Sequence, residues 1–401
     1  MRFERSFIPY GAYWSTPFCK WQGSLSTINA IPLAAQAARK AMAERDIPAG
    51  ELDGLVLGMT VPQKQGLYGG PWLAAMLGAE GITGTIVSQA CATGARALAT
   101  AAGEVELAPG RTVLGITADR CSNSPHIYYP NPQGPGGMGE KEDVVLDGFG
   151  HDPWARNSMI QTAENVAAEQ KIGREEQDQC VLVRHRQYED ALADDAAFHK
   201  RFMLLPFEVK DARGKKTLAK IEGDEGVFPT TAEGLAGLRP IMPDGTVTFG
   251  SQTHPADGNC GMVVTDRERA KRLSRDPEVE VRLLSYGQAR TDKGFMAKAT
   301  VPAARSALDA AGVKIDDIAV LKTHNPFAVN DVYLARELGK KIEDFNNYGS
   351  SLIYGHPQGP TGMRLIIETI EELTIKGGGL GLFTGCAAGD TSAAVVVKVG
   401  R

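Results

Sequence analysis

The sequence lacks three features that would point to a metal, a membrane or a nucleic acid. Its six cysteines stand apart with no CxxC pair: Cys19, Cys91, Cys121, Cys180, Cys260 and Cys386. Scattered thiols of this kind fit a reducing cytoplasm, so we expect a cytoplasmic protein without a metal site. No run is apolar enough to span a membrane, and the first residues lack the apolar core of a signal peptide. Lysine and arginine (43) are outnumbered by aspartate and glutamate (48), which argues against a nucleic-acid partner.

What the chain does hold is a repeated pattern. Gly94 and Gly362 open similar helical runs, and a further apolar strand begins nineteen residues after each glycine, at 113 and 381. Residues 32–59 and residues 301–321 are also similar, though less closely, because the pattern of each predicts a helix followed by a strand. The pattern predicts an α/β protein made of two similar halves.

A long insertion separates the two halves. We expect an N-terminal half in residues 1–118 and 251–275, an inserted loop domain in residues 119–250 and a C-terminal half in residues 276–401. Residues 126–138 of the insertion are rich in proline, glycine and tyrosine without periodicity, which is typical of a binding loop or lid. Its lysines and arginines form either a solvated face or contacts for an anionic ligand.

Cys91 lies where a short strand, residues 85–87, gives way to an alanine-rich helix, residues 93–102. The positive end of a helix dipole favours thiolate over thiol, and the thiolate is the nucleophile. Taken alone, such a residue is more often a buried structural cysteine.

Three further residues with reactive side chains stand at strand ends or in glycine-rich turns: His324, His356 and Cys386. In a protein of two α/β halves, these positions and Cys91 can meet at one edge of the core, where open sheets bind ligands. A cysteine beside a histidine is an activated nucleophile. A second thiol suits proton transfer to or from carbon, and backbone N–H groups near glycines can form an oxyanion hole.

Five motifs in order resemble the thiolase family over nearly the whole chain. They are Cys-Ala-Thr-Gly at 91–94, the helices at 162–178, the run at 234–248, Gly-His-Pro at 355–357 and Thr-Gly-Cys-Ala-Ala-Gly at 384–389. The resemblance implies a duplicated five-layer α-β-α-β-α core with an inserted loop domain. It also implies an acetyl-CoA acetyltransferase or 3-oxoacyl-CoA thiolase activity.

The same resemblance implies roles for the reactive residues. Cys91 would take the acyl group of a thioester, His356 would accept the Cys91 proton, and Cys386 would move the proton at the carbon next to the thioester. One oxyanion hole would use His356 with residue 324, and the other the N–H groups of Cys91 and Ala388. Coenzyme A would be a substrate, and no cofactor would be permanently bound.

Some positions depart from the common family pattern. His324 stands where most members have a water-holding asparagine, as in the sterol-carrier-type branch, and Ala388 replaces a glycine. Ser158-Met159-Ile160 replaces the usual His-Met-Gly before the helix at 162. Residues expected to contact CoA or the acyl group are Met159, Thr253, Met296 and Phe327.

The aromatic stretch 10–18 resembles a branch of the family that handles branched or aromatic 3-oxoacyl-CoAs, and the loop at 126–157 differs from that of ordinary acetoacetyl-CoA thiolases, so an unusual acyl group is expected. The resembling branch includes 2-benzoylsuccinyl-CoA thiolase, which yields benzoyl-CoA and succinyl-CoA and has a small zinc-finger/OB-type partner subunit. A homodimer or tetramer is expected. Two alternatives stay open: a ketosynthase-type condensing enzyme, and a thiolase-like subunit that is active only with a partner chain.

Overall fold

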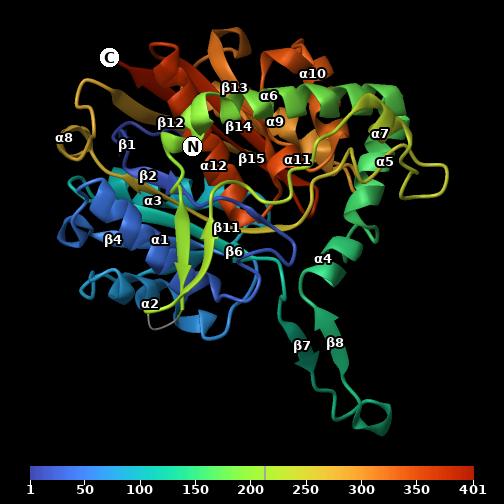
Figure 1. Ribbon diagram of the computed structural model, residues 1–401, viewed down its shortest axis with the longest axis horizontal. Coiled ribbons are helices and arrows are strands. Elements are labelled where there is room, and N and C mark those ends of the chain that lie inside the picture. Colours follow the sequence, from blue (N-terminus) through green and yellow to red (C-terminus); the bar gives the residue numbers. More distant parts are fainter. Residues whose placement is uncertain (212–213) are drawn as a thin grey trace.

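The computed structural model describes residues 1–211 and 214–401. Two mixed β-sheets form its core, the first in the lower part of Figure 1 and the second in the upper part. The first sheet has the order β2 (Tyr13–Ser15), β11 (Ala256–Val264), β6 (Val113–Arg120), β4 (Gly54–Gly58) and β5 (Thr85–Val87), and β3 (Cys19–Lys20) also pairs with β11. The second has the order β1 (Phe7–Pro9), β12 (Glu280–Arg290), β15 (Thr391–Gly400), β14 (Gly379–Ala387) and β13 (Ile318–His324).

Helices lie between the sheets and on both outer faces. The central pair, α3 (Thr93–Leu107) and α12 (Gly359–Ile375), contacts both sheets. On the outside, α1 (Ala30–Glu44) and α2 (Gly69–Met76) cover the first sheet, while α9 (Thr300–Ala311) and α10 (Ala328–Leu338) lie on the side of the second. Residues 359–374 of α12 are buried on every side, as a central helix must be. The predicted α-β-α-β-α layering is thus confirmed.

The two central helices cross where the sequence repeat begins. A Cβ on Gly94 would lie 2.5 Å from the Met363 backbone nitrogen and 2.6 Å from the Gly359 carbonyl oxygen. Only glycine allows the start of α3 to come this close to the start of α12. The loops that precede the two helices, with Cys91 in one and His356 in the other, are therefore held side by side.

The elements within each half largely follow the sequence pattern. One difference lies before β13, where residues 315–317 form a short 3-10 turn rather than the first part of the expected strand. The Asp317 carboxylate accepts the Lys314 N–H at 2.8 Å and thereby stabilises the turn. The remaining short elements of the halves are η1 (Ala49–Glu51), η2 (Gly66–Tyr68), α8 (Arg267–Arg272), η4 (Met296–Ala299), η5 (Ile315–Asp317), η6 (Ile342–Asp344) and α11 (Ser351–Tyr354).

The chain between β6 and β11 contains the elements expected of an insertion. It holds β7 (His126–Tyr129), η3 (Pro135–Gly137), β8 (Glu140–Asp143), α4 (Leu146–Gly150), α5 (Met159–Gln170), α6 (Arg174–Lys200), β9 (Phe207–Lys210), β10 (Thr217–Ile221) and α7 (Ala232–Ala236). The stretch expected to be an irregular loop is instead an antiparallel hairpin, β7–β8, that projects from the body in Figure 1. Its strands have no buried face, so no hydrophobic alternation marks them in the sequence.

The aromatic N-terminal stretch packs as edge strands. β1 pairs with β12 in the second sheet, whereas β2 pairs with β11 in the first, so the segment joins the two sheets. Tyr13, Trp14 and Phe18 are completely buried. Among the described residues, no helix has the length and apolar character needed to cross a membrane.

Candidate active site

Cys91 lies in a tight turn between β5 and α3. Ala90 adopts a positive φ of 43°, a strained conformation for a residue with a side chain. Thr93 holds the turn, because its hydroxyl accepts the Gln89 N–H and donates to the Ala90 carbonyl, both at 2.7 Å. The Gln89 side-chain oxygen in turn accepts from Tyr286 of β12 at 3.1 Å. The nucleophile loop is thus fixed by its own helix and by the other half of the protein.

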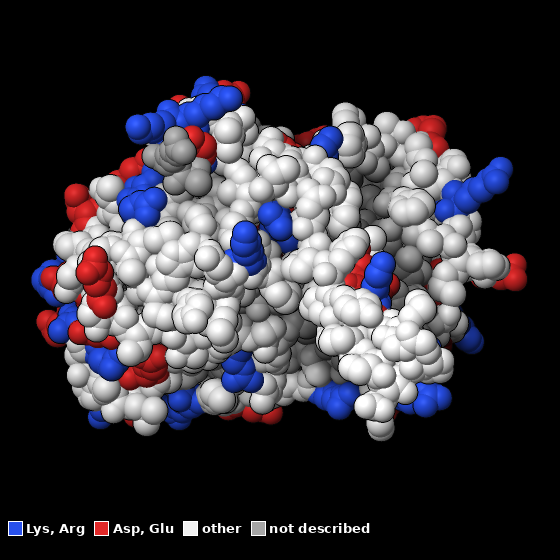
Figure 2. Space-filling model, turned by 90° about the horizontal axis from the view of Figure 1, so that it is seen from below, with Lys and Arg blue, Asp and Glu red and all other residues white. Residues whose placement is uncertain are grey.

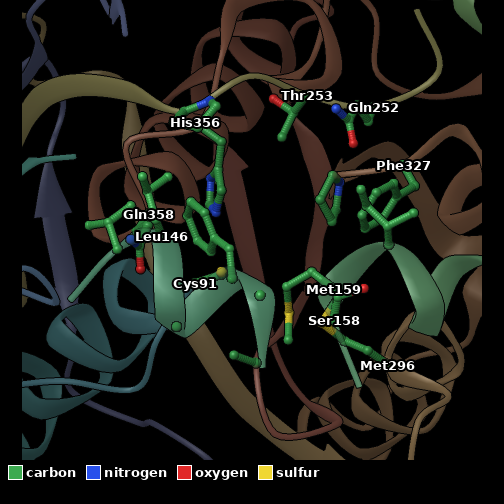
Figure 3. A pocket seen from close by; sticks show the side chains of 18 of the residues that line it. Cys91, Leu146, Ser158, Met159, Gln252, Thr253, Met296, Phe327, His356 and Gln358 are labelled. Atoms are coloured by element: carbon green, nitrogen blue, oxygen red, sulfur yellow. The ribbon is translucent and has the colours of Figure 1, made fainter. Parts of the chain in front are cut away.

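Two histidines face this turn from the second half. The Cys91 sulfur and one ring nitrogen of each of His324 and His356 all lie within 4.8 Å of one another. The two imidazoles stack with their centroids 4.0 Å apart and their planes at 26°. Figure 3 shows the His356 ring directed towards Cys91.

Each imidazole is oriented by a hydroxyl group. His356 Nδ1 lies 2.7 Å from Thr361 Oγ1, and His324 Nδ1 lies 2.8 Å from Ser351 Oγ. Among the described residues, neither Nε2 atom has a hydrogen-bond partner. Gly355 has a φ of 91°, and a Cβ there would lie 2.7 Å from a His254 ring nitrogen, so the turn before His356 requires glycine.

Cys386 stands at the end of β14, and its thiol lines the same cavity as Cys91. The Asn330 side-chain amide on α10 donates to its sulfur at 3.2 Å. Sequence reasoning did not single out Asn330, and its only signal is its place in the first turn of a helix that follows His324 and Phe327. The structure thus gives the second thiol a hydrogen-bond donor on α10.

Burial keeps the reactive groups neutral at rest. Burial raises the pKa of the Cys91 thiol to about 11, although the backbone N–H groups of Ala388 and Cys91 itself act to lower it. Burial also lowers the pKa of His324 to about 3, and burial with His324 and His254 nearby lowers the pKa of His356 well below its ordinary value. The backbone N–H groups thus act in the expected direction, towards the thiolate, but the desolvation of the thiol outweighs them and its pKa is raised overall.

The N–H groups expected to bind an oxyanion belong to Cys91 and Ala388, and both residues line the same cavity. Both N–H groups act to lower the pKa of the Cys91 thiol, against the larger effect of burial. A carbonyl carbon bonded to the sulfur would place its oxygen near the same two donors. Alanine at 388 serves as well as glycine here, because the contact is made by its backbone.

A cavity of about 460 Å³ opens above Cys91. Its walls include all four residues expected to contact the substrate: Met159, Thr253, Met296 and Phe327. Sequence reasoning missed Leu146 and Phe149 from α4, as well as Gln252 and Gln358. Figure 3 shows Leu146 close to His356 and Cys91, and Met159, Met296 and Phe327 on the opposite wall. His324 is only 1% exposed and lies behind this surface.

Asp119 connects the first half to the His356 loop. Its buried carboxylate accepts the Gly359 N–H at 2.9 Å, the Thr60 N–H at 2.8 Å and the Val61 N–H at 2.9 Å. Burial raises the pKa of Asp119 to about 7. Sequence reasoning missed this residue because it lies at the end of β6, far along the chain from the loop that it holds.

Among the described residues, one group of potential metal ligands is closely gathered: Cys91, His324 and His356. The spacing of cysteines along the chain gave no sign of such a group, because its members come from three separate segments: the turn before α3, the end of β13 and the loop before α12. A thiol, two imidazoles and backbone donors at one cavity can perform nucleophilic acyl transfer.

Comparisons with known proteins agree with this arrangement. The family model for the thiolase N-terminal domain matches residues 12–268, and that for the thiolase C-terminal domain matches residues 278–399. A beta-ketothiolase of Cupriavidus necator is 30% identical over 384 residues, covering 94% of this chain and 95% of the relative. The Escherichia coli acetyl-CoA acetyltransferase is 27% identical over 390 residues and 96% of each chain.

Solved structures show the same fold. The Bacillus anthracis acetyl-CoA acetyltransferase superposes with a TM-score of 0.90 at 26% identity, covering 99% of both chains. Human mitochondrial 3-ketoacyl-CoA thiolase, solved in complex with CoA, gives 0.89 at 24% identity over the full length of both chains. The chain therefore belongs to the thiolase family and is an acyltransferase that acts on CoA thioesters.

Proposed function

We propose that this thiolase cleaves a 3-oxoacyl-CoA with a bulky, uncharged acyl group, using Cys91 as the acyl carrier. The observation that carries the proposal is the meeting of the Cys91 sulfur with a ring nitrogen of His324 and of His356 within 4.8 Å, at the floor of a cavity that also holds Cys386.

The first step transfers a proton from Cys91 to His356. His356 can accept it at Nε2 only if its Nδ1–H donates to Thr361, at the observed 2.7 Å. Because both groups are neutral at rest, the transfer accompanies attack on the substrate rather than preceding it. The sulfur bonds to the 3-oxo carbon, and the oxygen that becomes negative is held by the N–H groups of Cys91 and Ala388.

The second step breaks the carbon–carbon bond. The electron pair of that bond passes to the departing CoA thioester as an enolate, and the Cys386 thiol gives its proton to the carbon. His324 can donate to the enolate oxygen from Nε2 if Ser351 donates to its Nδ1, at the observed 2.8 Å. A CoA thiol then gives its proton to the Cys386 thiolate and attacks the Cys91 thioester. The Cys91 sulfur leaves, takes back the proton held by His356, and the shortened acyl-CoA is released.

The cavity lining favours an uncharged acyl group. Leu146 from α4 lies on one wall, and Met159, Met296 and Phe327 lie on the other (Figure 3). Phe149 from the same helix also lines the cavity. Among the described residues, no lysine or arginine lines the cavity. The free carboxylate of 2-benzoylsuccinyl-CoA would have no cation to pair with there, so a branched or aromatic group without a second carboxylate suits the site better.

Mass spectrometry of the acyl-enzyme tests the proposal. The protein is exposed to acetoacetyl-CoA, an aromatic 3-oxoacyl-CoA, 2-benzoylsuccinyl-CoA and malonyl-CoA, and the mass added to Cys91 identifies the acyl group. We expect rapid acylation by the aromatic substrate and none in Cys91→Ser, with Cys180→Ser as the control. Preference for acetoacetyl-CoA or 2-benzoylsuccinyl-CoA would contradict the proposed acyl class. Dependence on malonyl-CoA would indicate a condensing enzyme, and acylation only after adding a small partner subunit would indicate a shared site.

We also propose that two copies of the chain pair along β5. This strand is the edge of the first sheet, and Ile86 is 39% exposed there, which is unfavourable for a solitary edge strand. Leu67 and Tyr68, just before α2, are exposed as well. Figure 2 views the side on which α2 and the β7–β8 hairpin lie in Figure 1, and much of that face is free of charged side chains. Sedimentation of Ile86→Lys should show a monomer, and an unchanged oligomer would exclude this interface.

A further inference from the structure

Two imidazole nitrogens without hydrogen-bond partners converge on a thiol at the bottom of the cavity. His324 and His356 are 1% and 4% exposed, and their Nδ1 atoms are occupied by Ser351 and Thr361. Their Nε2 atoms have no partner among the described residues. A buried polar atom without a partner is costly, so this arrangement is expected to attract a ligand when the substrate is absent.

We propose that Cys91, His324 and His356 together bind one Zn²⁺ ion when no substrate is bound, and that the metal inhibits the enzyme. Thiolate sulfur and imidazole nitrogen are the donors that zinc prefers. Zinc–sulfur and zinc–nitrogen bonds of about 2.3 Å and 2.0 Å place tetrahedral donors roughly 3.5 Å apart. The three donor atoms already lie within 4.8 Å of one another, so rotation of the Cys91 side chain and small ring movements can close the site.

The reaction needs no redox partner. The Cys91 thiol releases its proton to solvent as the zinc–sulfur bond forms, and each imidazole gives the lone pair of its Nε2. The fourth position of the metal faces the cavity and is left for water or a soft ligand, as in zinc sites with three protein ligands.

The hydroxyls behind the histidines support the tautomer that a metal needs. With both Nε2 lone pairs on the metal, each Nδ1–H donates to the hydroxyl already beside it. The Ser351 hydroxyl can then donate a hydrogen bond to Asn325 Oδ1, at 3.2 Å. Asn325 is itself held by Asp331, to which its amide donates at 2.6 Å. Such outer contacts orient metal-binding histidines and raise their affinity.

Metal and substrate cannot occupy the site together. Zinc would use the Cys91 lone pair that attacks the substrate and the Nε2 atoms that serve as base and oxyanion donor. The inhibition therefore rests on the proposed function, whereas the binding of the metal does not.

Cobalt substitution separates these two claims. Metal-free, reduced protein is titrated with Co²⁺, whose thiolate charge-transfer and tetrahedral ligand-field bands report the donor set without any turnover. We expect saturation at one equivalent, displacement by one equivalent of Zn²⁺, and loss of both bands once Cys91 is acylated. Absence of a thiolate band, or equal binding to acylated protein, would overturn the site. Binding with these bands but without inhibition of thiolysis would overturn the mechanism instead.

Four variants define the ligands by calorimetric titration with Zn²⁺. Cys91→Ser and His324→Asn should each weaken binding more than about 100-fold, beyond the loss typical of outer contacts. Ser351→Ala should weaken it about 10- to 100-fold. Cys180→Ser, which removes a buried thiol outside the site, should leave it unchanged. Circular dichroism verifies that each variant is folded, and equal zinc affinity in His324→Asn and the unmodified protein would contradict the proposal.

Discussion

The loops that lead into α3 and α12 occupy equivalent places in the two halves, yet they supply opposite chemistry. The first carries the acid, the Cys91 thiol, and the second carries the base, His356. Each is fixed by a residue of the other half: Tyr286 of β12 donates to Gln89, and Asp119 of β6 accepts from Gly359. The repeated architecture therefore brings the two loops together where α3 and α12 cross, and contacts between the halves set their relative position.

The two loops also differ in how they face solvent. Cys91 is half-buried beside the exposed strand β5, whereas the His356 side is enclosed and contains the stacked His324. The enclosed side keeps its imidazoles neutral because burial disfavours their charge. The reactive thiol can thus be reached by substrate, while its base and oxyanion donors stay dry and pre-oriented.

The largest expected effect is a difference in activity between variants of the two enclosed histidines, His356 and His324. His356→Asn removes the base for Cys91, so kcat/KM for thiolysis should fall about 10²- to 10⁴-fold. His324→Asn introduces the residue that most members of the family have at this position. Its kcat/KM should fall about tenfold at most, because an oriented water can replace the imidazole donor. Steady-state kinetics of both variants measure the contrast. Equal losses would show that the histidines act as one unit rather than in distinct roles.

The next effect concerns the half-buried thiol of the first loop. Because burial raises the pKa of Cys91 to about 11, the thiolate fraction rises tenfold for each pH unit well below that value. Alkylation by iodoacetamide should therefore speed up about 100-fold between pH 7 and pH 9, without the plateau that an ordinary thiol begins to show near its pKa of about 8.5. The same alkylation rate in Cys386→Ser would show that the modified thiol is Cys91. A plateau below pH 8 would instead show a stabilised thiolate.

A smaller effect should follow when the link between the halves is weakened. Asp119→Asn replaces one accepting oxygen with an amide that cannot accept from Gly359 or Thr60. The His356 loop should shift slightly, and kcat should fall about tenfold, below the roughly 100-fold cost that a 1 Å misplacement can reach. Single-turnover acylation measures this. Asp53→Asn, at the exposed end of the same half, is the matched control, and equal loss in both variants would point to general destabilisation.

The protonation of Asp119 makes the stability of the protein depend on pH in a definite direction. Its folded-state pKa is raised from 3.8 to about 7, so between these values the folded state binds more protons than the unfolded one. Its contribution to stability is therefore full below pH 3.8 and is lost as pH rises towards 7. Denaturant unfolding at pH 5 and pH 8 should show a smaller pH effect in Asp119→Asn than in the unmodified protein.

The sequence predicted the two halves and the residues at their loops because both depend on local pattern. Gly94 and Gly362 mark the crossing through their equal distance from the next strand, and Cys91, His356 and Cys386 lie in recognisable motifs. Asp119 and Asn330 were missed because their roles depend on which side chains meet across distant segments. The direction of the Cys91 pKa was also missed, since a helix terminus is visible in sequence whereas the burial that outweighs it is not.

The smallest effect probes the second thiol. Asn330 donates to Cys386 at 3.2 Å and lowers the pKa that burial raises, so Asn330→Ala should leave Cys386 a weaker acid. One such hydrogen bond contributes about 1 kcal/mol, which corresponds to roughly a fivefold change in rate. Exchange of the acyl-CoA α-proton with deuterated water should slow by about this factor, because it requires Cys386. Alkylation of Cys91 by iodoacetamide, which involves no proton from Cys386, should keep an unchanged rate and serves as the internal control. If both rates fell together, Asn330 would support the shape of the site rather than the acidity of one thiol, and the two thiols would not be tuned separately.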